Sequence, residues 1–194
     1  MFIVGRLGLS PRTGPVFCTH MAAPLTYLVA SPHLTGGMFE RGVILLLEHN
    51  AGGAMGLMVN AQTDLRLGDL LSSAAGREEL AWMGGPLEPH IGWCLYETST
   101  GQAGEVRLAP DLFVTSGLEV LEVVLRQPGR FMLLLGFAGW SAGQLDRELK
   151  EGTWLWVEAD PALVLDVPPD ERWTRALDLL GVNPASVMPG GAQA

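Results

Sequence analysis

Three side chains of this sequence have the types that thiol hydrolysis requires: Cys94, His49 and Asn50. A thiol is the nucleophile of such a reaction, an imidazole carries protons near neutral pH, and an amide orients the imidazole. A structural interpretation also fits. Cys94 lies inside the apolar run Ile91–Leu95, where a cysteine usually packs as a small hydrophobic residue. Asn50 and His49 precede the glycine-containing stretch Ala51–Gly56, where Asn50 can stabilise a turn while His49 caps a backbone carbonyl.

The remaining histidines and glycines lack the spacing of a metal site or a phosphate loop. His33, His49 and His90 have no paired spacing with a second histidine, a cysteine or a carboxylate. The glycines Gly52–Gly56 are followed by no lysine and lead into a strand, whereas a phosphate loop needs Gly-Lys-Ser/Thr before a helix. We therefore predict no metal and no cofactor, and assign no catalytic residue.

A ligand site is better predicted where strands and loops lead into helices. Ser116 and Glu119 have the spacing of a capping box, and Ser141 and Gln144 have the related Ser/Gln spacing. The N–H groups at a helix start attract an anion or a carbonyl oxygen. We expect both helix starts and the loop Gly84–Pro86 to converge on one shallow pocket. The predicted ligand-binding residues are His49, Asn50, Gly84, Gly85, Thr115, Ser116, Gly139, Trp140 and Ser141.

The elements that must position these residues are strands mixed with helices. Apolar and β-branched runs predict strands at Tyr27–Ser31, Gly42–Glu48, Gly56–Asn60, Gly92–Tyr96, Glu105–Leu108, Phe131–Phe137 and Trp154–Glu158. Helical spacing predicts helices at Leu67–Leu71, Leu118–Leu125, Ala142–Glu151 and Trp173–Leu180. Several neighbouring strands are joined by connections too short for a crossover helix. The sequence thus predicts an α/β fold of the α+β type, with a mixed, largely antiparallel sheet and three to four helices.

The composition limits the partners and the compartment. The chain has 194 residues, of which 48% are hydrophobic, and a net charge of −9 from 12 basic and 21 acidic residues. The basic residues are scattered, so we expect no direct binding of nucleic acid. The longest apolar runs are far shorter than the roughly 20 residues of a membrane span, so we expect no membrane partner. Two cysteines form no disulfide framework, which favours the cytoplasm.

The two ends of the chain differ from its middle. Residues 1–20 contain Arg6 and Arg12, no acid and several prolines and glycines, without the apolar core of a secretory signal. We predict that residues 1–20 are a disordered tail or follow a start site placed too early. A single domain is expected over residues 21–188, followed by a frayed C-terminus at 189–194.

Several short motifs, taken in order from about Leu25 to Val182, resemble those of the YqgE/AlgH family. They are Leu28–Pro32, Phe39–Ile44, Glu48–Asn50, Gly53–Leu57, Gly84–Pro86, Leu135–Trp140, Ala142–Leu145 and Arg172–Trp173. The resemblance implies a small bacterial protein built on a bent or pseudo-barrel sheet, with unassigned biochemical activity. One branch of that family is named as a transcriptional regulator. Where the family commonly has Asn-Arg-Pro this chain has Asn60–Ala61–Gln62, so a basic residue that could meet an anion is missing.

Two classes of function follow. The first is a cytoplasmic regulatory or interaction module without enzymatic activity, which binds a protein partner or a small ligand. The alternative is a hydrolase-like enzyme that uses His49 or Cys94. A pocket that holds His49 beside a nucleophile would favour the enzyme, and an apolar surface patch would favour the interaction module.

Overall fold

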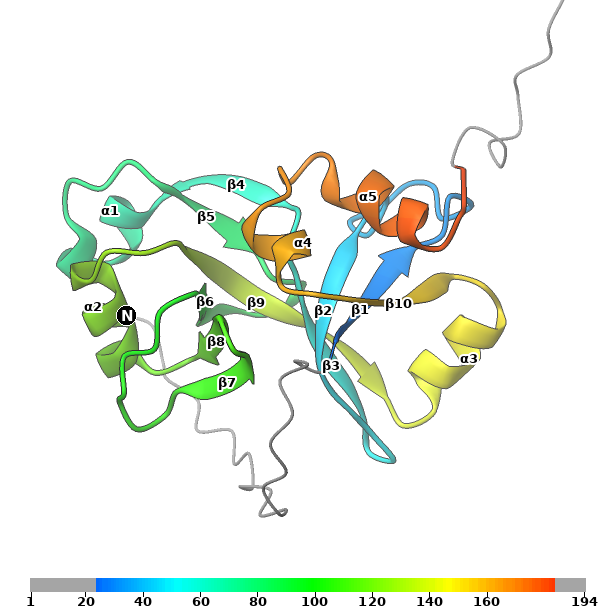
Figure 1. Cartoon of the computed structure of the whole chain (residues 1–194), viewed down its shortest axis with the longest axis horizontal. Coiled ribbons are helices and arrows are strands. Elements are labelled where there is room, and N and C mark those ends of the chain that lie inside the picture. Colours follow the sequence, from blue (N-terminus) through cyan, green and yellow to red (C-terminus); the bar gives the residue numbers. More distant parts are fainter. Residues whose placement is uncertain (1–23, 184–194) are drawn as a thin grey trace, which may run out of the picture.

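Ten strands form a continuous curled sheet in the computed structural model, which describes residues 24–183 (Figure 1). The strands are β1 (Leu25–Ala30), β2 (Val43–Asn50), β3 (Gly53–Met58), β4 (Gln62–Arg66), β5 (Leu80–Met83), β6 (Leu87–Tyr96), β7 (Val106–Ala109), β8 (Leu112–Thr115), β9 (Phe131–Ser141) and β10 (Trp154–Ala159). Their order is β10-β1-β2-β3-β9-β6-β8-β7, with β5 beside β9 and β4 beside β5. The pair β5–β9 is parallel and the other pairs are antiparallel, which confirms the predicted mixed, largely antiparallel sheet.

The described residues contain more helices than the three to four predicted. There are five, α1 (Leu67–Leu70), α2 (Leu118–Arg126), α3 (Gln144–Lys150), α4 (Ala162–Leu165) and α5 (Arg172–Leu179), and a 3₁₀ turn, η1 (Ser72–Ala74). The helix that was missed, α4, has a single turn of four residues, which is too short to show a helical period. The predicted tail at 1–20 and the predicted frayed end at 189–194 lie outside the described residues.

Both predicted capping boxes were wrong in their details. Helix α2 begins at Leu118 after the N-cap Gly117, and no side chain caps it, so Ser116 lies one residue too early. Ser141 is the last residue of β9, and the N-cap of α3 is Gly143 in a left-handed conformation. The Gln144 side chain does accept a hydrogen bond from the Ser141 backbone N–H at 3.0 Å, so half of the predicted reciprocal contact is present.

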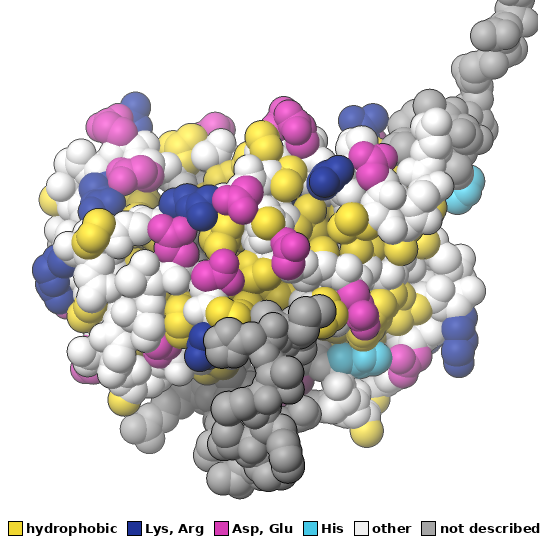
Figure 2. Space-filling model, viewed as in Figure 1, with side chains coloured by type: hydrophobic (Ala, Val, Ile, Leu, Met, Phe, Trp, Pro, Cys, Tyr) yellow, Lys and Arg dark blue, Asp and Glu magenta, His cyan; other side chains and the backbone are white. Residues whose placement is uncertain are grey.

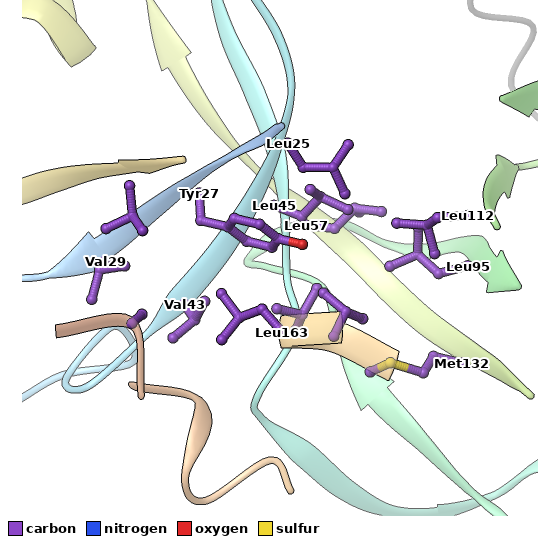
Figure 3. Packing of buried hydrophobic residues seen from close by; sticks show 14 of the residues in the cluster. Leu25, Tyr27, Val29, Val43, Leu45, Leu57, Leu95, Leu112, Met132 and Leu163 are labelled. Atoms are coloured by element: carbon purple, nitrogen blue, oxygen red, sulfur yellow. The ribbon is translucent and has the colours of Figure 1, made fainter. Parts of the chain in front are cut away.

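The largest hydrophobic cluster fills the inner face of the curl. Alternate residues of the strands point inward, and α4 and α5 cover them through Leu163, Val164, Trp173, Ala176 and Leu177. Figure 3 shows Tyr27, Leu45 and Leu57 gathered around Leu163 of α4. Burial on this scale provides most of the favourable free energy of folding.

A buried arginine ties α5 to this inner cluster. Arg172 is 5% exposed. It donates hydrogen bonds to the carbonyl oxygens of Val59, Val164 (2.6 Å) and Val167 (2.9 Å), and its guanidinium lies 5.6 Å from the ring centre of Trp82. Burial lowers the pKa of Arg172 to about 10. The motif Arg172–Trp173 is therefore part of the framework, since the Trp173 indole also donates to the carbonyl of Ala30 at 2.8 Å.

Two smaller clusters cover the outer face of the sheet, each beneath one helix. We call them the α2 layer and the α3 layer. The α2 layer consists of Leu67, Ala74, Ala81, Cys94, Tyr96, Phe113, Val120, Leu121, Val124, Leu125 and Leu133. The α3 layer consists of Leu28, Ala30, Ile44, Ala54, Met58, Ala138, Trp140, Leu145 and Trp154. Helices α2 and α3 lie at opposite ends of the molecule (Figure 1).

Strand β9 belongs to both layers because its alternation reverses at one glycine. Before Gly136, Leu134 belongs to the inner cluster and Leu133 to the α2 layer, so the even-numbered residue points inward. After Gly136, Phe137 packs against the inner cluster and Ala138 belongs to the α3 layer, so the odd-numbered residue points inward. Gly136 has φ +69°, and the pairing with β6 shifts register at this point. A bulge of this kind turns the following side chains over to the other face.

Candidate functional site

The outer face has an apolar groove between α2 and the segment that carries α1 and η1. We define the groove by its lining residues, which are Leu70, Leu71, Ile91, Gly92, Cys94, Thr115, Ser116, Gly117, Leu118, Leu121, Leu133 and Leu135. Its cavity volume is about 50 Å³, well below the range of about 300–1,000 Å³ that encloses a drug-sized ligand. The groove has room for one or two branched aliphatic groups and for little more.

Polar groups in the groove are few and mostly engaged. The Thr115 hydroxyl donates to the carbonyl of Gly104 at 3.1 Å and accepts from the N–H of Gly117 at 3.0 Å. Ser116 is half-buried and forms no side-chain hydrogen bond with any residue between 24 and 183. Cys94 is 1% exposed, and burial raises the pKa of its thiol well above its usual range. The groove therefore favours apolar contact and offers no thiolate.

The opposite end of the molecule, under α3, is closed by a connected set of polar contacts. Glu148 accepts hydrogen bonds from the indole N–H groups of Trp140 (2.8 Å) and Trp154 (3.0 Å) and from the Gln144 amide (3.0 Å). Gln144 in turn accepts from the hydroxyl of Ser141 at 3.1 Å. The two indole rings meet edge to face with centroids 5.8 Å apart. Trp140 and Ser141 thus anchor α3 to the sheet.

His49 lies next to this layer because of a bulge in β2. The register between β2 and β3 shifts between Leu46 and Glu48, which directs His49, and not Glu48, toward α3. His49 Nε2 lies 3.1 Å from the Asp146 carboxylate, and its ring lies 6.1 Å from that of Trp156. Instead of the predicted contact with a backbone carbonyl, His49 of β2 thus contacts the carboxylate of Asp146 of α3.

Asn50 has the structural role that was one of the two interpretations. Its side-chain oxygen accepts a hydrogen bond from the N–H of Gly52 at 2.7 Å, and its amide donates to Glu48. Strands β2 and β3 extend further than predicted, so only Ala51 and Gly52 lie between them. The connection between the predicted strands Gly42–Glu48 and Gly56–Asn60 is thus shorter than their bounds indicate, and Asn50 stabilises its two-residue turn.

Gly84 and Gly85 allow two backbone segments to touch. A Cβ atom on Gly84 would lie 2.3 Å from the carbonyl oxygen of Gly136, and one on Gly85 would lie 2.1 Å from the carbonyl carbon of Phe137. Gly139 is also tightly packed, since a Cβ there would lie 2.8 Å from the Leu87 side chain. Close packing accounts for all three glycines.

The predicted convergence of the site residues was wrong. Thr115 and Ser116 line the groove at α2, whereas Ser141 and Trp140 lie at α3, at the other end of the molecule (Figure 1). The hydrolase combination is likewise not assembled, because Cys94 belongs to the α2 layer and His49 pairs with Asp146 of α3. The cause is β9, which runs from one layer to the other instead of ending at Phe137 as predicted.

Comparison with known proteins gives a family to this fold. The family model described as AlgH-like matches residues 27–185. The chain belongs to the AlgH-like family. A UPF0301 protein of Vibrio parahaemolyticus is 34% identical over 174 residues, which cover 83% of this chain and 93% of the relative. One from Ralstonia pickettii is 37% identical over 168 residues, covering 82% of this chain and 88% of the relative.

Solved structures agree with this membership of the AlgH-like family. The solution structure of the AlgH protein from Pseudomonas aeruginosa is similar with a TM-score of 0.69 and 29% identity, covering 93% of this chain and all of that one. Protein DIP2367 from Corynebacterium diphtheriae, with a TM-score of 0.67, 24% identity and coverage of 87% and 88%, shares the fold. The resemblance inferred from the motifs is thus confirmed.

In this AlgH-like chain the conspicuous motifs belong to the framework, and sequence reasoning missed most of the groove. Leu70, Leu71, Ile91 and Gly92 were not among the predicted site residues, and each is of a type that also fills cores. Leu118 is 44% exposed in the structure, although the other leucines of α2 are buried. The helical pattern alone placed Leu118 in the apolar stripe and did not indicate its exposure.

The described residues also bear on metal binding, membrane spanning and basic surface charge. Within the described part of this AlgH-like chain, no three His, Cys, Asp or Glu side chains are placed to hold a metal ion. In the same residues, no helix has the length and apolar character needed to cross a bilayer. On the face seen in Figure 2, basic side chains alternate with acidic ones and form no continuous basic surface.

Proposed function

We propose that this AlgH-like chain is a cytoplasmic regulatory or interaction module that binds an apolar group, from a small ligand or a partner protein, in the groove beside α2. The observation that carries the proposal is the groove itself, an open apolar feature of the outer face between α2 and the segment that carries α1. An exposed apolar groove is the usual feature of a site for association.

The other predicted site residues support this choice indirectly. His49, Asn50, Trp140 and Ser141 have partners within the fold, and the glycines Gly84–Gly85 are occupied by close packing. Thr115 and Ser116 are the predicted residues that line the groove. A hydrolase using Cys94 or His49 is disfavoured, because a thiol with a raised pKa is a poor nucleophile and the histidine is engaged elsewhere.

The proposal is tested by titrating the full chain with 1-hexanol and recording the methyl resonances of the leucines. We expect shifts at Leu118, Leu121 and Leu133 and none at Leu179, which is an exposed leucine of α5 outside the groove. Equal shifts at Leu118 and Leu179 would indicate unspecific contact and would refute the proposal.

A variant that fills the groove provides the second measurement. A Cβ on Gly92 would meet the Leu133 side chain at 3.4 Å, an ordinary contact distance, so Gly92→Val adds methyl groups to the groove without backbone strain. We expect Gly92→Val to weaken hexanol binding at least about tenfold. Leu179→Ser serves as the matched control and should leave binding unchanged.

A further inference from the structure

The charges beside the groove restrict the kind of partner that it can accept. Asp69 directly precedes the lining residue Leu70, Glu119 follows Leu118, and Glu122 lies one helical turn after Leu118. Asp69 and Glu119 are exposed and Glu122 is half-buried. Between residues 24 and 183, none of these three carboxylates has a basic side chain within ion-pair distance.

The basic side chains nearest in the chain are already paired with other groups. Arg66, at the start of α1, forms an ion pair with Glu78 at 2.9 Å. Arg77 pairs with Glu79 at 2.9 Å and donates to the carbonyl of Leu125 at 2.6 Å. Arg126 lies in the last turn of α2, away from the groove end of that helix. Among the described residues, the charged side chains next to the lining residues Leu70 and Leu118 that have no ion-pair partner are therefore acidic.

We propose that the occupant of the groove is a short protein segment with one or two adjacent aliphatic residues flanked by arginine or lysine. This inference rests on the proposed function and goes further by naming the partner's chemistry. The small apolar volume fits leucine-sized side chains, and the three carboxylates, which have no ion-pair partner among residues 24–183, attract cationic neighbours. The net charge of −9 adds attraction at longer range and repels acidic lipid surfaces and nucleic acids.

The test uses the full chain and three synthetic peptides that share a central Leu-Leu pair and differ in their flanks. The first peptide is acetyl-Arg-Ser-Leu-Leu-Ser-Arg-amide, the second has Glu in place of Arg, and the third has Gln. Affinities are measured from the same leucine methyl resonances. We expect the basic peptide to bind about tenfold more tightly than the acidic one at about 0.02 M salt, and the ratio to fall to about twofold at about 0.5 M, where charges are screened beyond a few ångströms.

Charge reversal places the effect on the named residues. The double variant Asp69→Lys/Glu119→Lys should abolish or invert the preference for the basic peptide, since it reverses two of the three carboxylates beside the groove and both side chains are exposed. The matched control is Glu158→Lys/Asp178→Lys, two acidic positions on β10 and α5. It makes the same change in net charge and should keep the preference.

The outcomes separate this inference from the proposed function. Equal affinity of the three peptides, or binding of hexanol with no peptide binding, would overturn the inference and leave the apolar groove as the binding site. Preference for the basic peptide that survives Asp69→Lys/Glu119→Lys would also overturn it. If neither hexanol nor any of the peptides binds at the groove of the unmodified chain, the proposed function is overturned as well.

Discussion

The α2 layer and the α3 layer differ in how their helix is held against the outer face of the sheet. Under α3, Glu148 and Gln144 connect the helix to two tryptophans, and the layer is closed. At the start of α2, the side-chain contact with a strand is local, from the Gly117 N–H to the Thr115 hydroxyl of β8, and a groove remains between α2 and α1. The polar and tryptophan side chains that were predicted to bind a ligand at α3 therefore stabilise the fold. The groove is instead lined mainly by leucines.

The largest expected effect concerns the glycine that joins the two layers. Gly136→Ala should lower the free energy of unfolding by at least about 3 kcal/mol, because a left-handed residue gains a Cβ that would lie 2.5 Å from the Gly85 carbonyl oxygen. Gly143→Ala is the matched control, with φ +70° and no atom within 4 Å of the added Cβ, and should cost about 1 kcal/mol. Urea denaturation measures both, and equal losses would show that the close approach is unimportant.

A smaller effect compares the two helices directly. Leu145 of α3 is 1% exposed and Leu118 of α2 is 44% exposed. Leu145→Ala should therefore destabilise the protein by about 3 kcal/mol, and Leu118→Ala by less than about 1 kcal/mol. Thermal or urea unfolding of the two variants gives the values, and a large loss for Leu118→Ala would mean that α2 seals its layer after all.

The hydrogen bonds that Glu148 accepts under α3 should contribute less to the free energy of unfolding than the burial of Leu145 does. Glu148→Ala removes the acceptor of two indole N–H groups, those of Trp140 and Trp154, and should destabilise the protein by about 2 kcal/mol. Glu151→Ala, on the same helix with an exposed pair at 4.0 Å to Arg147, should change stability by less than about 0.5 kcal/mol. A near-zero effect of Glu148→Ala would remove the contrast between the layers.

The smallest effect concerns pH, on the α2 side. Glu105 accepts hydrogen bonds from Tyr96 (2.9 Å) and Thr100 (2.7 Å), and although burial alone would raise its pKa, the bonds from Ser99, Thr100 and Tyr96 lower it below the ordinary 4.5. A lowered carboxyl pKa stabilises the fold above the unfolded value and loses that contribution as pH falls through the folded value. Glu105→Gln should thus lower stability by about 1 kcal/mol at pH 7 and progressively less below about pH 4.5. Urea denaturation of the two proteins at pH 7 and below about pH 4.5 measures the difference in stability. A difference that does not change with pH would contradict an origin in the lowered pKa of Glu105.

Much of the fold could be predicted from patterns that repeat along the chain. The strands at Gly92–Tyr96 and Trp154–Glu158 and the helix that begins at Leu118 were found from apolar periodicity, and the structure has elements there. Strands β4, β5 and β8 were missed because β4 is mostly exposed and because β5 and β8 have only four residues each. Periodicity cannot identify such short or polar elements.

The site was less predictable, for a physical reason. Ser141 and Gln144 were recognised as partners from their spacing, since that contact is local. The groove, in contrast, depends on Leu70, Ile91 and Leu118, which come from three elements and are apolar like core residues. Whether such residues are open or covered is decided by tertiary packing, which no local pattern encodes.

The reversal at Gly136 also limits how this chain can change its length. Removing or adding a single residue between Leu135 and Ala138 would exchange the inward and outward sides of the remainder of β9, so Trp140 would leave its pocket under α3. Insertions are far more tolerable at the exposed turn Ala51–Gly52, where the side chains are not packed against the sheet. We therefore expect related sequences to have neither insertions nor deletions at the centre of β9.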